Sequence, residues 1–167
     1  MINDILFYFG QYLDRYTFLV PLGIIGVWRW SVWMMKEIIG LAYRPKTKAY
    51  HANVSIITPV YNENPKLFER ALLSWKENKP REIIAVIDYT DEECIKVFKK
   101  FKKNFSAGVL IITKIPGKRQ ALADGIKAAK SEILALVDSD TIWTKDTLQN
   151  GLPPFHDKLV AGVATYQ

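Results

Sequence analysis

The dominant pattern along the chain is a repeated pairing of a short apolar run with a longer segment whose apolar residues recur at helical spacing. The apolar runs begin at Val54, Ile83, Val109 and Ile133, and none of them alternates with polar residues. Uninterrupted runs of this length are typical of strands that are buried on both faces. Their alternation with helical segments predicts an α/β fold with a mostly parallel sheet and flanking helices.

Local signals predict where several elements begin and end. Asn64 stands directly before a proline, which predicts a capped helix start, and the polar stretch 78–80 ends with a proline that predicts the end of that helix. Thr90 and Glu93 have the spacing of a capping box. Pro59 predicts the end of the first strand, because proline cannot donate to a ladder.

Two further elements are predicted after the fourth apolar run. Polar residues at 144–147 suggest a short helix, which the glycine and prolines of 151–155 end. The segment LVAGVATYQ, residues 159–167, predicts another strand.

The N-terminal part has a different composition. Residues from Thr17 to Met35 are almost all apolar and carry one charge, Arg29, and a membrane-spanning helix needs about 20 such residues. Arginine near the middle of a span costs about 2.5 kcal/mol or more, which the surrounding aliphatic and aromatic side chains can offset. A helix lying in the headgroup region is an alternative, since Arg29 and Lys36 would suit its wet face. A soluble helix is a third interpretation.

A basic polar stretch, RPKTKAYHAN, separates this part from the first strand. We therefore expect two parts: a membrane-associated segment with its linker at 1–53, and an α/β domain at 54–167. Cations at Arg44, Lys46 and Lys48 place the α/β domain on the cytoplasmic side of the cell membrane by the positive-inside rule.

Charge and composition narrow the partners only partly. The formal charge of +6 suits a phosphate-bearing partner or an anionic membrane surface. The single cysteine, Cys94, excludes an internal disulfide and a cysteine zinc site. Two histidines, His51 and His156, are too few and too isolated for a histidine metal centre.

The fourth apolar run ends abruptly in two carboxylates, Asp138 and Asp140, separated by one serine. Ligands of open α/β sheets bind at the carboxyl ends of the strands. Two oxygen donors there suit Mg²⁺ or Mn²⁺, which complete their coordination with water and substrate phosphate. The alternative is an Asp-rich turn in which Asp140 caps the next segment.

Two cations, Lys118 and Arg119, stand at the start of the helix predicted after the third run. The helix dipole disfavours cations at this end, whereas a bound anion would be stabilised by them and by the free N–H groups. They therefore suggest a phosphate ligand, although a pair of surface charges is the alternative.

Charged side chains follow every predicted strand. Because the carboxyl ends of parallel strands meet at one edge, these residues are expected to form one crevice with carboxylates for a metal and a sugar and a cation for a diphosphate. They are Glu63, Asp88, Lys118, Asp138 and Asp140.

Four ordered motifs resemble those of family 2 glycosyltransferases. They are PVYNE at 59–63, VIDYTDE around Asp88, PGKRQALADGI at 116–126 and VDSD at 137–140. The chain is most similar to the membrane-embedded processive group, the hyaluronan, chitin and cellulose synthases. The likeness covers Val54 to Gln167, and the apolar N-terminal part resembles the transmembrane segment that precedes the domain in that group.

The resemblance implies a Rossmann-like GT-A fold preceded by a membrane helix. It further implies inverting transfer from a nucleotide-diphosphate sugar, typically UDP-linked, to a glycan or lipid acceptor, with Mg²⁺ or Mn²⁺ and without a nucleic-acid partner. By position, the donor-binding residues would be Pro59, Tyr61, Glu63, Asp88, Lys118, Arg119, Asp138 and Ser139. Of these, Tyr61 and Glu63 would lie at the nucleoside, Asp88 at the base, Lys118 at the diphosphate and Asp138 at the ribose or sugar. Asp140, together with Asp138, would hold the metal.

The sequence departs from the family pattern in two respects. Many relatives have Asp-Asp-Gly-Ser where this chain has Asp88-Tyr89-Thr90-Asp91, which weakens the expected base contact. The family's general base, in a Thr-Glu-Asp or similar motif, and its Gln-x-x-Arg-Trp motif are not found, and neither Asp146 nor Asp157 is marked as a substitute. We therefore expect the donor-binding half of a truncated enzyme, with the base beyond Gln167.

Two other functions are compatible with parts of the pattern. A membrane-tethered nucleotide-sugar-binding module would keep the donor site without turnover. A sugar nucleotidyltransferase is disfavoured, because PVYNENP lacks the Gly-rich loop with Arg and Lys that such enzymes carry after the first strand.

Overall fold

The computed structural model describes residues 24–42, 44 and 48–164. The chain divides into two compact units, Met1–Pro45 and Lys46–Gln167.

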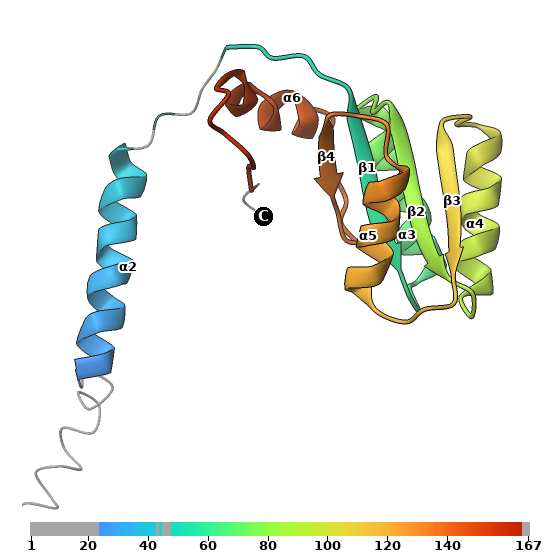
Figure 1. The fold of residues 1–167 in the computed structure, drawn as a ribbon, viewed down its shortest axis with the longest axis horizontal. Helices are drawn as coiled ribbons and strands as arrows, with labels where there is room; N and C mark the ends of the chain where they lie inside the picture. Colours follow the sequence, from blue (N-terminus) through green and yellow to red (C-terminus); the bar gives the residue numbers. More distant parts are fainter. Residues whose placement is uncertain (1–23, 43, 45–47, 165–167) are drawn as a thin grey trace, which may run out of the picture. The chain divides into compact units, whose positions relative to one another are not determined.

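The described part of the first unit consists of the helix α2, Ile24–Ala42, and residue 44 (Figure 1). Many large apolar side chains along this helix are exposed, among them Trp28, Trp30 and Trp33. Among the residues described by the structure, no helix has the length and apolar character required for a membrane span. The first part of the predicted span, 17–23, lies outside the described residues.

The second unit is built on a four-stranded sheet of order β3-β2-β1-β4. Its strands are β1 Val54–Val60, β2 Glu82–Asp88, β3 Gly108–Thr113 and β4 Ile133–Leu136. All neighbouring pairs are parallel, so the predicted parallel α/β architecture is confirmed. The central strands β1 and β2 are almost completely buried.

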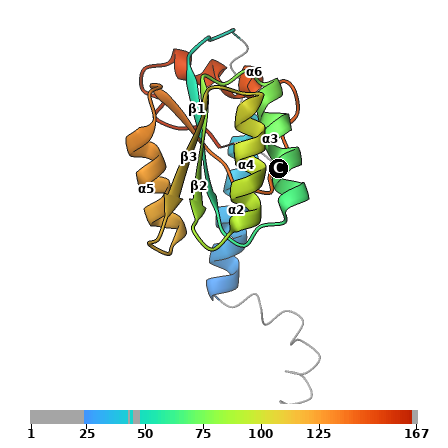
Figure 2. The ribbon, with the colours of Figure 1, turned by 90° about the vertical axis from the view of Figure 1, so that its right-hand side faces the viewer.

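Helices cover both faces of the sheet. On one face lie α3, Pro65–Glu77, and α4, Glu92–Lys103, and on the other lies α5, Lys118–Ala128 (Figures 1 and 2). A short helix α6, Thr147–Gly151, and a 3-10 turn η2, Pro153–His156, follow β4. The short helix predicted near 144–147 is therefore present, shifted toward the C-terminus.

Each face of the sheet has its own apolar core. The core under α3 and α4 contains Phe68, Trp75 and Phe98, all completely buried. The smaller core under α5 includes Ile57 and Ala121. There α5 comes so close to the sheet that a Cβ on Gly125 would collide with the side chain of Ile57.

The predicted cap of the first helix is confirmed, whereas the predicted end of the first strand is wrong. Asn64 caps α3 as expected, with its side chain accepting hydrogen bonds from the backbone N–H groups of Lys66 and Leu67. The prediction that Pro59 ends the strand is wrong, because β1 continues to Val60. Every second residue of a parallel strand forms its backbone hydrogen bonds with the same neighbouring strand, so Pro59, like Ile57, faces the β4 side. Because the pairing of β1 with β4 ends at Ile57, no strand requires an N–H from Pro59.

Three other expectations are wrong in detail. Asp91 rather than Thr90 caps α4, because the Thr90 hydroxyl donates to Asp88 instead. The fourth strand is not buried on both faces: β4 is a four-residue edge strand, and Leu136 is 53% exposed. Residues 159–164 form no strand, since no strand of the described part of the chain pairs with them and Leu159 is 92% exposed. Residues 165–167 lie outside the described part.

Candidate functional site

A cleft of about 550 Å³ opens at the carboxyl ends of the strands. The predicted gathering of charged residues at this edge is confirmed, because Glu63, Asp88, Lys118, Asp138 and Asp140 all line it. Other predicted residues also line it, namely Pro59, Tyr61 and Ser139. Arg119 is exposed and is not among the residues that line the cleft.

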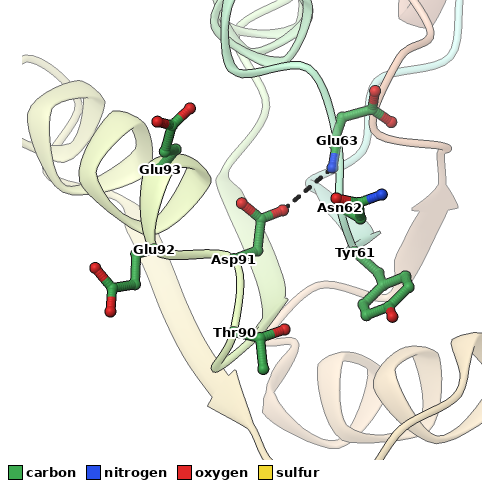
Figure 3. Close-up of a pocket in the computed structure, with 7 residues that line it drawn as sticks. All are labelled: Tyr61, Asn62, Glu63, Thr90, Asp91, Glu92 and Glu93. Carbon is green, nitrogen blue, oxygen red and sulfur yellow. Dashed lines mark hydrogen bonds between the residues drawn. The ribbon is translucent and has the colours of Figure 1, made fainter.

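The loop after β1 brings Glu63 to the centre of the site. Its carboxylate accepts hydrogen bonds from the Ser139 hydroxyl at 2.8 Å and from the backbone N–H of Asn64 at 2.8 Å. Its own N–H donates to Asp91 at 3.2 Å, and its carboxylate points away from that contact (Figure 3). Glu63 therefore connects the ends of β1, β2 and β4 rather than standing free in the cleft.

Asp88 is the last residue of β2 and is 7% exposed. One carboxylate oxygen accepts the hydroxyl of Thr90 at 2.6 Å and its backbone N–H at 2.9 Å. These two bonds favour the ionised form and hold the pKa of Asp88 below its ordinary value. At neutral pH this side chain is thus a charged hydrogen-bond acceptor.

The turn before α5 places Lys118 in the cleft. Gly117 caps the helix with φ of 122°, a conformation that side-chain-bearing residues rarely adopt. Lys118 follows as the first helical residue, and its ammonium forms an ion pair with the carboxylate of Asp138. Lys118, which was predicted to bind a phosphate, is therefore in direct contact with Asp138, which was predicted to bind a metal or a sugar.

The turn that carries Asp138 and Asp140 is held on both sides. Before it, the Val137 N–H donates to the Ile57 carbonyl at 3.0 Å. After it, the Trp75 indole N–H donates to the Thr141 carbonyl at 2.8 Å. This fixed turn exposes the two aspartates to the cleft.

The two aspartates differ in their contacts. Asp138 pairs with Lys118, whereas the carboxylate of Asp140 has no hydrogen-bond or ion-pair partner among the described residues. Between them Ser139 is only 8% exposed and turns inward to Glu63. An unpartnered carboxylate in an open cleft is available for a cation.

Within the described ranges, no three or more His, Cys, Asp or Glu residues converge as a complete metal cage would require. The cleft offers two carboxylates on one turn, which fits the chemistry of Mg²⁺ or Mn²⁺. These ions bind one or two carboxylates and fill the remaining positions with water and substrate phosphate. The residues present therefore fit a divalent ion that arrives with a phosphate ligand.

A second recess of about 360 Å³ adjoins the loop after β1 (Figure 3). It shares Tyr61 and Glu63 with the cleft and is otherwise lined by Asn62 and residues 90–93. Four of its seven lining residues are acidic and none is basic, so the recess offers an anion no cation. Phosphate groups are therefore favoured in the cleft beside Lys118 instead.

Sequence reasoning missed the supporting residues of the site. Asp91 was noted only within the Asp-Tyr-Thr-Asp departure, although it directly precedes α4 and is a good cap, and Thr90 was expected to cap that helix rather than to bond Asp88. Thr113, Ile115 and Gly117 also line the cleft. Their positions depend on where β3 ends and α5 begins, which apolar periodicity does not specify to the residue.

Comparisons with known proteins agree with this geometry. The family model "Glycosyl transferase family 2" matches residues 55–166. The chain is 31% identical over 159 residues to the NDP-glycosyltransferase ltbB of Aspergillus luteorubrus, covering 89% of this chain and 38% of the relative.

A solved structure is also similar. It is the mannosyltransferase PcManGT from Pyrobaculum calidifontis in complex with GDP-Man and Mn²⁺, with a TM-score of 0.67 and 26% identity. The match covers 90% of this chain and 44% of that one. The chain thus spans less than half the length of either protein.

Proposed function

Because the chain belongs to glycosyl transferase family 2, we propose that its cleft binds a nucleotide-diphosphate sugar, whose sugar is transferred with inversion to a hydroxyl of a glycan or lipid acceptor. The observation that carries this proposal is the gathering of four carboxylates and one lysine at the carboxyl edge of one parallel sheet. Such an edge is the usual ligand site of open α/β folds.

Different residues of the cleft bind different parts of the donor. Lys118 binds the diphosphate. The negative charge of the diphosphate then replaces the Asp138 carboxylate as the ion-pair partner of Lys118. The exposed ring of Tyr61 offers a stacking surface for the base, and Asp88 offers an ionised acceptor for a base N–H. Asp138, released from Lys118, becomes available to the sugar or to a metal.

Asp138 and Asp140 would hold Mg²⁺ or Mn²⁺ together with the diphosphate. A bound divalent ion supplies Lewis-acid stabilisation of the charge that develops on the departing diphosphate. The support from this chain is the carboxylate of Asp140, which has no partner among the described residues, and its place in the same cleft as the lysine that we assign to phosphate.

We propose UDP as the nucleotide, following the resemblance of the four motifs. GDP is the second candidate, because the similar mannosyltransferase structure contains GDP-Man. Calorimetric titrations with UDP and GDP, each with and without Mn²⁺, separate the two. Tighter UDP binding in the presence of Mn²⁺ supports the proposal, and preference for GDP reverses the nucleotide assignment.

Turnover is a separate question from binding. Three of the cleft carboxylates already accept contacts from Ser139, Thr90 or Lys118, which leaves Asp140 as the unpartnered one of those lining the cleft. If Asp138 and Asp140 both hold the metal, and Glu63 and Asp88 keep their present hydrogen bonds, none of these carboxylates is left to deprotonate an acceptor. A nucleotide-sugar-binding module without turnover is therefore the second candidate function, and release of UDP from UDP-sugars with and without acceptor distinguishes the two.

We further propose that the N-terminal segment attaches the protein to the cytoplasmic face of the cell membrane. In α2, Arg29 and Lys36 are seven residues apart and so lie on one side of the helix. Large apolar side chains, including Trp28, Ile38 and Leu41, are exposed elsewhere on it. Flotation of the full chain with anionic vesicles tests this proposal, and recovery of the chain in the lipid-free fraction contradicts it.

A further inference from the structure

We propose that Asp91, which the family motifs did not bring into the donor site, is a positioning residue for that site. It fixes the backbone of Glu63, and the Glu63 carboxylate holds the Ser139 hydroxyl so that the flanking aspartates face the cleft. This inference rests on the proposed nucleotide and metal binding.

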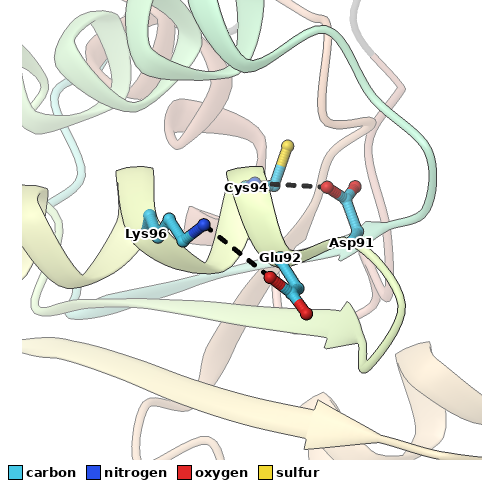
Figure 4. A network of polar contacts seen from close by, with 4 residues as sticks. All are labelled: Asp91, Glu92, Cys94 and Lys96. Carbon is cyan, nitrogen blue, oxygen red and sulfur yellow. Dashed lines mark hydrogen bonds and ion pairs between the residues drawn. The ribbon is translucent and has the colours of Figure 1, made fainter.

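The Asp91 carboxylate makes two contacts, one with each of its oxygens. One oxygen accepts the Cys94 N–H at 3.1 Å and caps α4, while the other accepts the Glu63 N–H at 3.2 Å (Figures 3 and 4). A helix cap requires only the first contact. The second joins the start of α4 to a loop that is 28 residues away along the chain.

The carbonyl of Glu63 is held from the same helix. Cys94 is completely buried and directs its Sγ to this oxygen at 3.6 Å. Burial, together with the charge of Asp91, raises the pKa of Cys94 to about 12, so the thiol keeps its proton and can donate. Both polar backbone groups of Glu63 are thus bonded to the first turn of α4.

A fixed backbone determines where the Glu63 carboxylate lies. One of its oxygens accepts the Ser139 hydroxyl at 2.8 Å, across 76 residues of sequence. Ser139 lies between Asp138 and Asp140 in a turn closed by the Thr141 N–H and the Asp138 carbonyl at 3.1 Å. Because the serine is held inward, its two neighbours remain exposed at the cleft.

The three contacts form a chain from α4 through Glu63 to the paired aspartates. Groups that orient metal ligands typically contribute about 10- to 100-fold to metal affinity without touching the ion. Asp91 lines the adjacent recess and not the cleft itself. It therefore acts through other residues and is not a catalytic group.

Substituting Asp91 by serine separates the two contacts. Serine is a good helix cap and can still accept the Cys94 N–H, but its short side chain does not reach Glu63. We expect Asp91→Ser to unfold near the wild-type temperature and yet to lose about tenfold in Mn²⁺-dependent UDP affinity. Asp91→Ala should lose both cap stability and affinity.

Ser139→Ala breaks the same chain at its other end. Calorimetric UDP titrations in Mn²⁺ on Asp91→Ser, Ser139→Ala and the double variant measure their coupling. Because both substitutions interrupt the same chain of contacts, the double variant should bind UDP no more weakly than whichever single variant binds UDP more weakly. Additive losses, or wild-type affinity of Asp91→Ser, would overturn the inference.

A ligand-free measurement keeps this result distinct from the proposed function. If the wild type binds UDP without Mn²⁺ dependence, the proposed metal role fails. Hydrogen exchange of the Thr141 amide, which closes the aspartate turn, then tests the positioning chain alone. Faster exchange in Asp91→Ser supports the inference, and unchanged exchange overturns it.

Discussion

The ammonium of Lys118 and the carboxylate of Asp138 form an ion pair across the cleft, joining the start of α5 to the turn after β4. Both side chains are well exposed, at 61% and 59%, so solvent screens the pair and its contribution to folding is small. Such a pair is easily exchanged for another. An arriving diphosphate offers Lys118 a stronger anion and a divalent ion offers Asp138 a stronger cation.

Replacing Lys118 by alanine should weaken UDP binding far more than uridine binding, because only UDP carries the phosphates. Hydrogen bonds to charged groups contribute about 1.5–3 kcal/mol, so a loss on the order of 10- to 100-fold in UDP affinity is expected. Calorimetry with both ligands measures it. Arg119→Ala is the matched control, since this neighbouring cation does not line the cleft. Equal losses for UDP and uridine would place Lys118 away from the phosphates.

Replacing Asp140 by asparagine should abolish the Mn²⁺ dependence of UDP binding while leaving the fold intact. The substitution keeps the size of the side chain but removes the charge that a hard cation requires. Glu132→Gln is the control, because it removes a carboxylate from the loop just before β4, at the other end of that strand. Titration of UDP with and without Mn²⁺ decides the matter, and an unchanged profile for Asp140→Asn would count against its metal role.

The sequence predicted the parts of the fold that depend on periodicity. Four apolar runs gave four parallel strands, and the residues that follow them meet in one cleft because strand direction alone places them there. It did not predict that β4 is a half-exposed edge strand, since an apolar run indicates burial but not its place in the sheet. Membrane attachment and the processive subgroup stay predictions.

Contacts between distant residues could not be predicted from spacing. The Glu63 to Ser139 bond spans 76 residues and the Glu63 to Asp91 bond spans 28. Each depends on the order of the strands and on the exact ends of the loops. Thr90 shows that local contacts are also hard to predict. A threonine at this position could cap α4 or bond to Asp88, and in the structure its hydroxyl bonds to Asp88.

Replacing Gly117 by alanine should destabilise the fold and impair UDP binding together. At φ of 122° a side chain strains the backbone, and such strain costs on the order of 1–3 kcal/mol. Relief of this strain shifts the backbone next to the first residue of α5, which is Lys118. Urea unfolding and UDP titration measure the two effects. Gly151→Ala is the control, because a Cβ there meets no atom within 4 Å, and comparable losses in both variants would contradict the prediction.

Replacing Thr90 by valine should return the pKa of Asp88 toward its ordinary value. The Thr90 hydroxyl is the largest cause of the lowered pKa, and its backbone N–H, which valine retains, is the second. A carboxyl group whose pKa is lowered by folding stabilises the native state above its unfolded pKa. That contribution is lost as the pH falls through the folded pKa. The variant should therefore lose stability relative to the wild type at neutral pH, and the difference should disappear in acid below both pKa values.

NMR titration of the Asp88 carboxyl carbon, combined with urea unfolding at several pH values, measures both effects. Thr147→Val, which removes a hydroxyl bonded to the Thr144 carbonyl and far from Asp88 in the sequence, serves as the control. An Asp88 titration curve that does not move in Thr90→Val would show that the hydroxyl does not set its ionisation.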